Sequence, residues 1–86
     1  MAKKRIEHGM VSGHFSDDVW SKEKRKKIHW DVNVTMDKKK EIRCYSARDG
    51  QFITQWTATN EDTELVWKNP NALGSVARRN FFKHVR

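Results

Sequence analysis

Residues 28–36 read IHWDVNVTM, and this stretch decides the fold class of the chain. Apolar side chains alternate with polar ones over all nine residues. Strict alternation of this kind is typical of a β-strand with one buried face and one solvated face. We therefore expect a strand over Ile28–Met36, followed by a charged turn over Asp37–Lys40.

Two more strands are predicted downstream, over Glu41–Ala47 and Gln51–Thr59. They flank the tripeptide Arg48-Asp49-Gly50, and an Asp-Gly pair between such runs is a strong hairpin signal. The three predicted strands then form an antiparallel meander, because short connections favour neighbouring antiparallel strands.

The register of this hairpin depends on the length of its loop. A two-residue loop would place Ala47 opposite Phe52, whereas a three-residue loop with a left-handed Gly50 would place Ala47 opposite Gln51. The second register gathers the apolar side chains on one face, so we favour it. That face then carries Ile42, Cys44, Ser46, Phe52, Thr54 and Trp56, and the open face carries Arg43, Tyr45, Ile53 and Gln55.

Helices are predicted on both sides of the meander. Upstream, Ser16 is a candidate N-cap for a short helix over Asp17–Lys27, which begins with acidic residues and ends with basic ones, as the helix dipole favours. Downstream, Asn69-Pro70 is a typical helix start. The apolar residues that follow it at helical spacing are Leu73, Val76, Ala77, Phe81 and Val85. Between the meander and this helix, Thr63–Lys68 fits either a fourth short strand or an irregular link.

The predicted architecture is therefore α+β: a three-stranded antiparallel meander, a C-terminal helix packed on one face, a short N-terminal helix and a flexible basic arm. With 86 residues the chain allows a single small domain. We assign residues 14–86 to this domain and residues 1–13 to the arm, which contains Lys3, Lys4 and Arg5.

The charge of the chain is the main indication of its partners. Its formal net charge is +7 at neutral pH, which is large for 86 residues. Phosphate backbones are the commonest counterpart of such an excess, because each lysine or arginine contact releases condensed counterions. Acidic protein surfaces and anionic membranes are the competing counterparts. We expect DNA or RNA as the partner, and no membrane.

Several functional classes find no support in the sequence. The single cysteine, Cys44, allows no intramolecular disulfide and lies on the predicted core side, where cysteine packs as a small apolar residue. No CxxC, HxxxH or HExxH spacing occurs, so we predict no metal site and no cofactor. No apolar stretch is long enough for a membrane span or a secretory signal. We expect a cytoplasmic protein that is not an enzyme.

Basic residues fall into separate groups, and single runs of this kind normally face water at the ends of secondary structure. Their joint presence predicts a surface for nucleic acid. Arg43 and Tyr45 on the open sheet face would add stacking or groove contacts. The predicted nucleic-acid contacts are Lys24, Arg25, Lys26, Lys27, Lys38, Lys39, Lys40, Arg43, Tyr45, Arg78, Arg79 and Lys83.

The large aromatic residues are divided between core and surface. Trp30 and Trp56 share strand parity with apolar neighbours, so we expect them in the core. Trp20 and Trp67 fit either the edge of the core or a contact with a partner, and Phe82 lies on the basic side of the last helix. These last three residues are the candidates for a protein interface.

Three functions are consistent with these features. The first is a nucleic-acid-binding accessory protein that docks on phosphates. The second is a phage-type or mobile-element-type regulator or inhibitor that binds a host protein, such as a polymerase or nuclease subunit. The third is a metal-free ribonuclease that would use His29, Glu41, Arg43 and His84 for acid–base chemistry.

Overall fold

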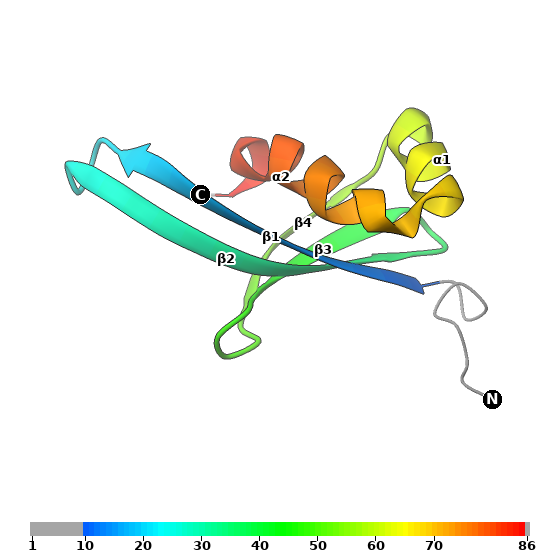
Figure 1. Ribbon diagram of the computed structural model, residues 1–86, viewed down its shortest axis with the longest axis horizontal. Helices are drawn as coiled ribbons and strands as arrows, with labels where there is room; N and C mark the ends of the chain where they lie inside the picture. The colour runs from blue at the N-terminus through cyan, green and yellow to red at the C-terminus, as the bar shows by residue number, and fades with distance from the viewer. Residues whose placement is uncertain (1–9, 86) are drawn as a thin grey trace.

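The computed structural model describes residues 10–85 and has four strands in one sheet with two helices on one of its faces (Figure 1). The strands follow one another in the order β1-β2-β3-β4, and every neighbouring pair is antiparallel. The elements are β1 (Met10–Ser21), β2 (Lys26–Asp37), β3 (Glu41–Ser46), β4 (Phe52–Thr57), α1 (Asn60–Lys68), a 3-10 turn (Pro70–Ala72) and α2 (Leu73–His84). The α+β class is confirmed, with one strand more than predicted.

Strand β1 replaces the predicted N-terminal helix. Asp17–Ser21 belong to β1, Lys22–Arg25 form the turn and Lys26 begins β2, so the helix over Asp17–Lys27 is wrong. β1 also contains Met10–Gly13 of the predicted arm; the remainder of the arm lies outside the described residues.

A physical reason for this difference lies in the spacing of the apolar residues of β1. Val11, Phe15 and Val19 recur every four residues, a spacing that places them on one side of either a helix or a strand. The partner strand decides between the two. In the structure these residues stand opposite Met36, Val32 and Ile28 of β2. The hydroxyl of Ser16 donates to Asp31 (2.9 Å) rather than capping a helix.

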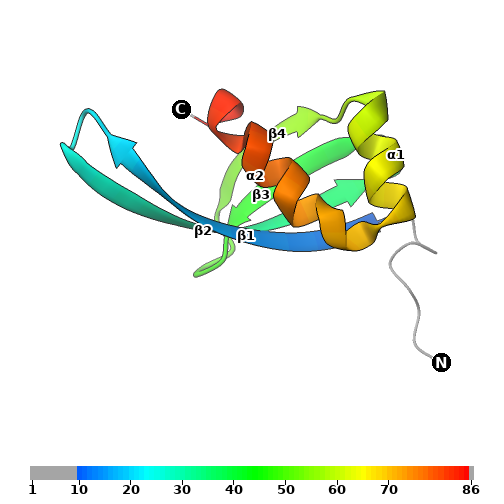
Figure 2. The same cartoon turned by 45° about the horizontal axis from the view of Figure 1, so that its top comes forward.

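The β1–β2 ribbon projects well beyond the rest of the sheet (Figures 1 and 2). Its two strands pair from Met10↔Asp37 to Ser21↔Lys26, whereas β3 pairs with β2 only from Val32 to Met36. The far half of the ribbon therefore has no neighbouring strand, and the molecule extends 47 Å along its longest axis but only 17 Å along its shortest.

The β3–β4 hairpin confirms the preferred register in part. Cys44 pairs with Thr54 and Ile42 with Trp56, as the three-residue loop predicts, and Gly50 has a left-handed φ of 71°. A bulge next to the turn then shifts the pairing, so that Tyr45 stands opposite Phe52. As a result Phe52 lies on the open face and Ile53 packs against the core, the reverse of the prediction for these two residues.

Helix α1 occupies the segment for which a strand or an irregular link was predicted. The hydroxyl of Thr59 caps its N-terminus by accepting a hydrogen bond from the backbone N–H of Asp62 (3.1 Å). Acidic residues occupy its first turn and Lys68 its last. Only Val66 is fully buried, so this helix has too few apolar residues to show helical spacing in the sequence.

Helix α2 confirms the predicted C-terminal helix and packs mainly on β1. The short turn at Pro70–Ala72 leads into it, and its buried side chains are Leu73, Val76, Ala77 and Phe81. Gly74 allows the close approach, because a Cβ there would lie 2.3 Å from the backbone oxygen of His14. Side chains from all four strands and both helices contribute to the core below the helices, where Trp30 and Trp56 are partly buried.

No helix within residues 10–85 is both long and apolar enough to cross a membrane.

Candidate nucleic-acid interface

The β1–β2 turn carries the densest group of cations in the described part of the chain. Lys22–Lys27 contains five cations and one carboxylate, and all six residues are exposed. The turn itself is held by its backbone. Ser21 accepts from the N–H of Arg25 through its carbonyl (2.7 Å) and from the N–H of Lys24 through its hydroxyl (3.2 Å). We call Lys22–Lys27 the basic turn.

Arg25 occupies an unfavourable backbone conformation within the basic turn. Its φ of 56° lies in the left-handed region, where residues other than glycine are strained by about 1–2 kcal/mol. Glycine or asparagine is the usual choice at such a position. The turn thus carries a cation where a neutral residue would fit the backbone better.

The cations of the basic turn have no internal partners within residues 10–85. The ion pairs among these residues involve Arg43, Arg78, Arg79, His14 and His29, and none reaches the basic turn. The net charge of +4 in six consecutive residues therefore faces solvent at the end of the projecting ribbon. The predicted contacts Lys24, Arg25, Lys26 and Lys27 therefore all lie exposed in this turn.

Trp20 stands next to the basic turn, on the open face of the ribbon. It pairs with Lys27 across the two strands, and 59% of its surface is exposed. The opposite face of the ribbon is covered instead. Trp30 packs edge-on against Phe81 and Phe82 of α2, with ring centroids 5.3 and 6.1 Å apart. The helix thus supports the ribbon from one side and leaves the other side accessible.

The second predicted cation group, Lys38–Lys40, lies at the opposite end of β2, where Asp37 holds the backbone of the turn; the side chains of Lys38 and Lys39 are exposed and form no ion pair within residues 10–85. Asp37 accepts hydrogen bonds from the backbone N–H groups of Lys39 (2.9 Å) and Glu41 (3.1 Å), and its second oxygen accepts from Arg43 (3.1 Å). Partial burial opposes these contacts, but the hydrogen bonds and the Arg43 charge prevail and lower the pKa of Asp37.

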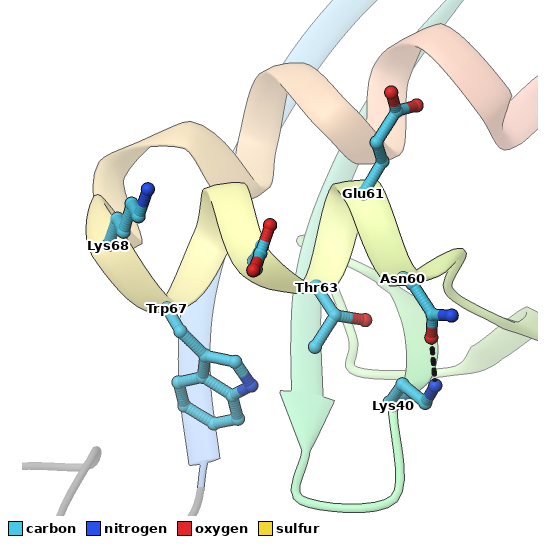
Figure 3. Close-up of a pocket in the computed structure, with 7 residues that line it drawn as sticks. Lys40, Asn60, Glu61, Thr63, Trp67 and Lys68 are labelled. Atoms are coloured by element: carbon cyan, nitrogen blue, oxygen red, sulfur yellow. Dashed lines mark hydrogen bonds between the residues drawn. The ribbon is translucent and has the colours of Figure 1, made fainter.

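Lys40 continues this set of contacts toward α1. Its ammonium group donates to the side-chain oxygen of Asn60 at the start of the helix (2.5 Å), as Figure 3 shows. Around this contact lies a shallow pocket of about 590 Å³, in which Trp67 is the large apolar side chain. Glu61 and Glu64 balance the charges of Lys40 and Lys68 there, so the pocket has no surplus of positive charge for an anion. Trp67 belongs to the edge of the core.

The third cation group lies on α2 and is largely neutralised. Arg78 pairs with Asp17 of β1 (3.2 Å), and Arg79 pairs with Asp62 of α1 (2.7 Å). Lys83 is exposed and forms no ion pair with another residue in the range 10–85. Phe82, predicted as an interface candidate on this side, packs instead against Trp30 and the core.

The open sheet face places Arg43 and Tyr45 as predicted, but with different neighbours. Arg43 is paired with Asp37, and its charge is thereby offset. Tyr45 packs edge-on against Phe52, with ring centroids 5.8 Å apart. Tyr45 is half-buried, whereas Phe52 is 52% exposed. The bulge in β4 thus creates an aromatic pair that the predicted register did not contain.

A row of histidine and aspartate side chains on the open face was missed by the sequence analysis. His14 contacts Asp31 through its Nε2 (2.5 Å), and His29 contacts Asp18 through its Nδ1 (2.6 Å). Hydrogen bonds from Ser16 and then His14 lower the pKa of Asp31, and the hydrogen bond to Asp18 raises the pKa of His29. The sequence did contain a signal for this row, because His29 and Asp31 alternate on the polar side of β2. Their partners Asp18 and His14 lie in β1, which was not predicted as a strand.

The residues considered for a ribonuclease are not brought together. His29 pairs with Asp18, Arg43 with Asp37, and Glu41 accepts from Gln55 and Thr57. His84 stacks on Trp56 on the helix side, with ring centroids 4.4 Å apart. Cys44 is fully buried, and burial raises the pKa of its thiol to about 12, so its reactive thiolate is scarce at neutral pH.

Comparison with known proteins assigns no relative: no protein-family model, no curated protein and no solved structure matches this chain.

Proposed function

We propose that the protein binds nucleic acid and that the basic turn is its main contact with the phosphate backbone. The observation that carries this proposal is the group of exposed cations in Lys22–Lys27, which has no ion-pair partner within residues 10–85 and stands at the end of a projecting ribbon. Such cations reach phosphates without giving up an internal partner, and each contact releases counterions. In this proposal the protein is a binding module, and no residue has a catalytic role.

The conformation of Arg25 supports the proposal. A cation at a left-handed position destabilises the turn relative to glycine, yet its side chain forms no hydrogen bond with any residue in the range 10–85 that would offset the strain. Backbone strain of this kind is concentrated at functional sites. A requirement for positive charge at this point of the ribbon accounts for it.

The test compares two variants of equal net charge. The first replaces four cations of the basic turn (Lys24→Gln, Arg25→Gln, Lys26→Gln and Lys27→Gln). The control replaces four exposed lysines elsewhere (Lys38→Gln, Lys39→Gln, Lys68→Gln and Lys83→Gln). Binding is measured by fluorescence anisotropy with labelled duplex DNA, duplex RNA and single strands between 50 and 200 mM salt.

We expect the wild-type affinity for duplex DNA to fall by roughly 100-fold over this salt range, the decrease that about four phosphate contacts produce. The basic-turn variant should lose most of its affinity and most of its salt dependence, while the control variant stays within a few-fold of wild type. Equal losses in the two variants would assign binding to net charge rather than to the basic turn. No affinity of the wild-type protein for any of these nucleic acids would refute the proposal.

Trp20 favours a second candidate function, the binding of an acidic surface on a host protein such as a polymerase or nuclease subunit. An exposed tryptophan beside cations is typical of protein interfaces, where aromatic residues dominate the binding energy. A pull-down from nuclease-treated lysate separates the two candidates. The second function would replace the first under two conditions. The chain itself must show no affinity for nucleic acid, and it must retain a host protein in stoichiometric amount that the Trp20→Ala variant no longer retains.

A further inference from the structure

We infer that the projecting part of the β1–β2 ribbon enters the major groove of B-form DNA, with its open face toward the base edges. This inference rests on the proposed function and specifies its substrate class. The projecting part comprises the paired segments from Asp17↔Trp30 to Ser21↔Lys26 together with the basic turn between them, since the carbonyl of Asp31 still accepts a hydrogen bond from the N–H of Ala47 (2.9 Å).

The shape of the ribbon matches a duplex groove. Five paired rows at about 3.3 Å per residue give a projection of roughly 13 Å before the turn, and the two strands lie about 4.8 Å apart. The major groove of B-form DNA is about 12 Å wide and 8.5 Å deep, and it admits a two-stranded ribbon with its side chains. The minor groove is only about 6 Å wide, so the ribbon does not fit there without opening the groove.

The positions of the cations fit the two walls of such a groove. Lys22 follows the end of β1 and Lys26 begins β2, so both strands carry a lysine where they meet the turn. Lys24 and Arg25 occupy the turn between them. A ribbon that lies in the groove with its open face toward the bases would therefore carry positive charge at both of its edges near the turn, close to the phosphates of both DNA strands, which fixes its position without reading sequence.

The packing of α2 decides which face of the ribbon meets the bases. On the helix side, Trp30 packs edge-on against Phe81 and Phe82, so the end of α2 covers this face where the ribbon begins to project. Farther along, Val19 and Ile28 line a pocket of about 400 Å³ that also reaches Trp20 and Lys24. The open face presents Trp20 and Lys27 directly opposite each other. Next to them, His29 binds the carboxylate of Asp18 and reduces the repulsion that this carboxylate would exert on phosphates.

Other nucleic acids fit this surface less well. Proteins that bind single strands combine a positively charged groove with several aromatic stacking positions. Here the cations lie on a convex projection, and Trp20 is the one aromatic side chain on its open face. Duplex RNA has a deep and narrow major groove that protein side chains do not read. The convex ribbon therefore favours B-form DNA over both alternatives.

The experiment measures affinity for a 20-base-pair DNA duplex, the duplex RNA of the same sequence and each single strand, at one salt concentration. The second arm adds methyl green, which occupies the major groove, or netropsin, which occupies the minor groove. We expect the DNA duplex to bind at least about tenfold more tightly than RNA or single strands, with methyl green displacing the protein and netropsin having no effect.

A pair of aromatic variants tests the orientation of the ribbon. Trp20→Ala should weaken duplex binding by about tenfold, because the apolar contact of its ring with base edges and thymine methyl groups would be lost. Phe52→Ala removes an equally exposed aromatic side chain from the same sheet face, outside the projecting part, and should leave affinity unchanged. Circular dichroism and thermal melting confirm that both variants fold.

The outcomes separate this inference from the function on which it rests. Tighter binding to single strands or to duplex RNA, or displacement by netropsin, would overturn the groove assignment while leaving nucleic-acid binding intact. An unchanged affinity in Trp20→Ala would overturn the orientation of the open face. The absence of binding to any of the four nucleic acids would overturn the inference and the proposed function together.

Discussion

The two basic turns at the ends of β2 have similar sequences but differ in how they are held. The β1–β2 turn and the β2–β3 turn each carry a run of lysines and one cation with a left-handed backbone: Arg25, with a φ of 56°, in the first and Lys40, with a φ of 69°, in the second. Around the second turn, Asp37 binds two backbone N–H groups and Arg43, and Lys40 binds Asn60. The first has only the contacts that close its own backbone.

The location of a basic run in the fold, rather than its composition, determines how far the rest of the molecule holds it. The β2–β3 turn lies in the four-stranded part of the molecule, beside α1 (Figure 3). Its polar contacts contribute to the stability of the domain. The β1–β2 turn lies where no other element within residues 10–85 offers a carboxylate, so its cations remain available to an external anion.

The largest expected effect on stability comes from removing the carboxylate that holds the β2–β3 turn. Asp37→Ala leaves two backbone N–H groups and one guanidinium without their acceptor, so we expect a loss of about 1–3 kcal/mol in the free energy of unfolding. Urea denaturation measures it. The matched change in the other turn, Glu23→Ala, should stay within about 0.5 kcal/mol of wild type. Similar losses in both variants would contradict the difference between the two turns.

A smaller effect, of opposite sign, is expected from glycine at the left-handed position of the first turn. Arg25→Gly relieves the strained φ and removes no side-chain contact with another described residue, so it should stabilise the domain by roughly 0.5–1 kcal/mol. Affinity for duplex DNA should fall several-fold in the same variant, because one phosphate contact is lost.

The second turn supplies the control for this prediction. Lys40→Gly relieves the same strain but removes the hydrogen bond to Asn60, so the two effects should nearly cancel in a thermal melt. A destabilised Arg25→Gly variant would show that the arginine contributes to the fold. The left-handed backbone of Arg25 would then give no support to a role of its charge in binding.

Much of the sheet could be predicted from the sequence because its signals are local. The alternation over Ile28–Met36 and the Asp49-Gly50 pair identified three strands and one hairpin, and both are confirmed within one or two residues. Pro70 marked the approach to α2. Each of these signals rests on side-chain spacing or turn chemistry, which a single segment carries by itself.

The remaining elements depend on partners that the local pattern does not contain. The segment over Asp17–Lys27 has helix-like charges, but the match between Val19 and Ile28 and between Phe15 and Val32 across the ribbon outweighs them. The exchange of Phe52 and Ile53 follows from a bulge, which no loop-length argument reveals. Four residues of the basic turn, Lys24–Lys27, were predicted as contacts, and that role stays a prediction. The sequence could not show which of the predicted cations are neutralised by Asp17, Asp37 and Asp62.

The smallest expected effect is a pH dependence that also differs between the two ends of the ribbon. In the projecting part, the hydrogen bond to Asp18 raises the pKa of His29 in the folded protein. The folded state therefore binds this proton more tightly than the unfolded chain, and the pair stabilises the domain fully below the ordinary histidine value of about 6.5. As the pH rises through the raised pKa, this contribution is lost. In the four-stranded part, the pKa of Asp37 is lowered, so its contribution is lost only as the pH falls into the acid range.

Denaturation curves between pH 5.5 and 8 should therefore show a slight decrease in stability for the wild-type protein as the pH rises. The decrease should be smaller in His29→Gln, which keeps a polar side chain next to Asp18 but cannot take up a proton. On the open side, Asp31 also faces this pair, and its charge adds to the rise in the pKa of His29. If the free energy of unfolding changes with pH to the same extent in wild type and His29→Gln, the Asp18–His29 contact does not persist in solution. His29 would then not reduce the repulsion between Asp18 and phosphates.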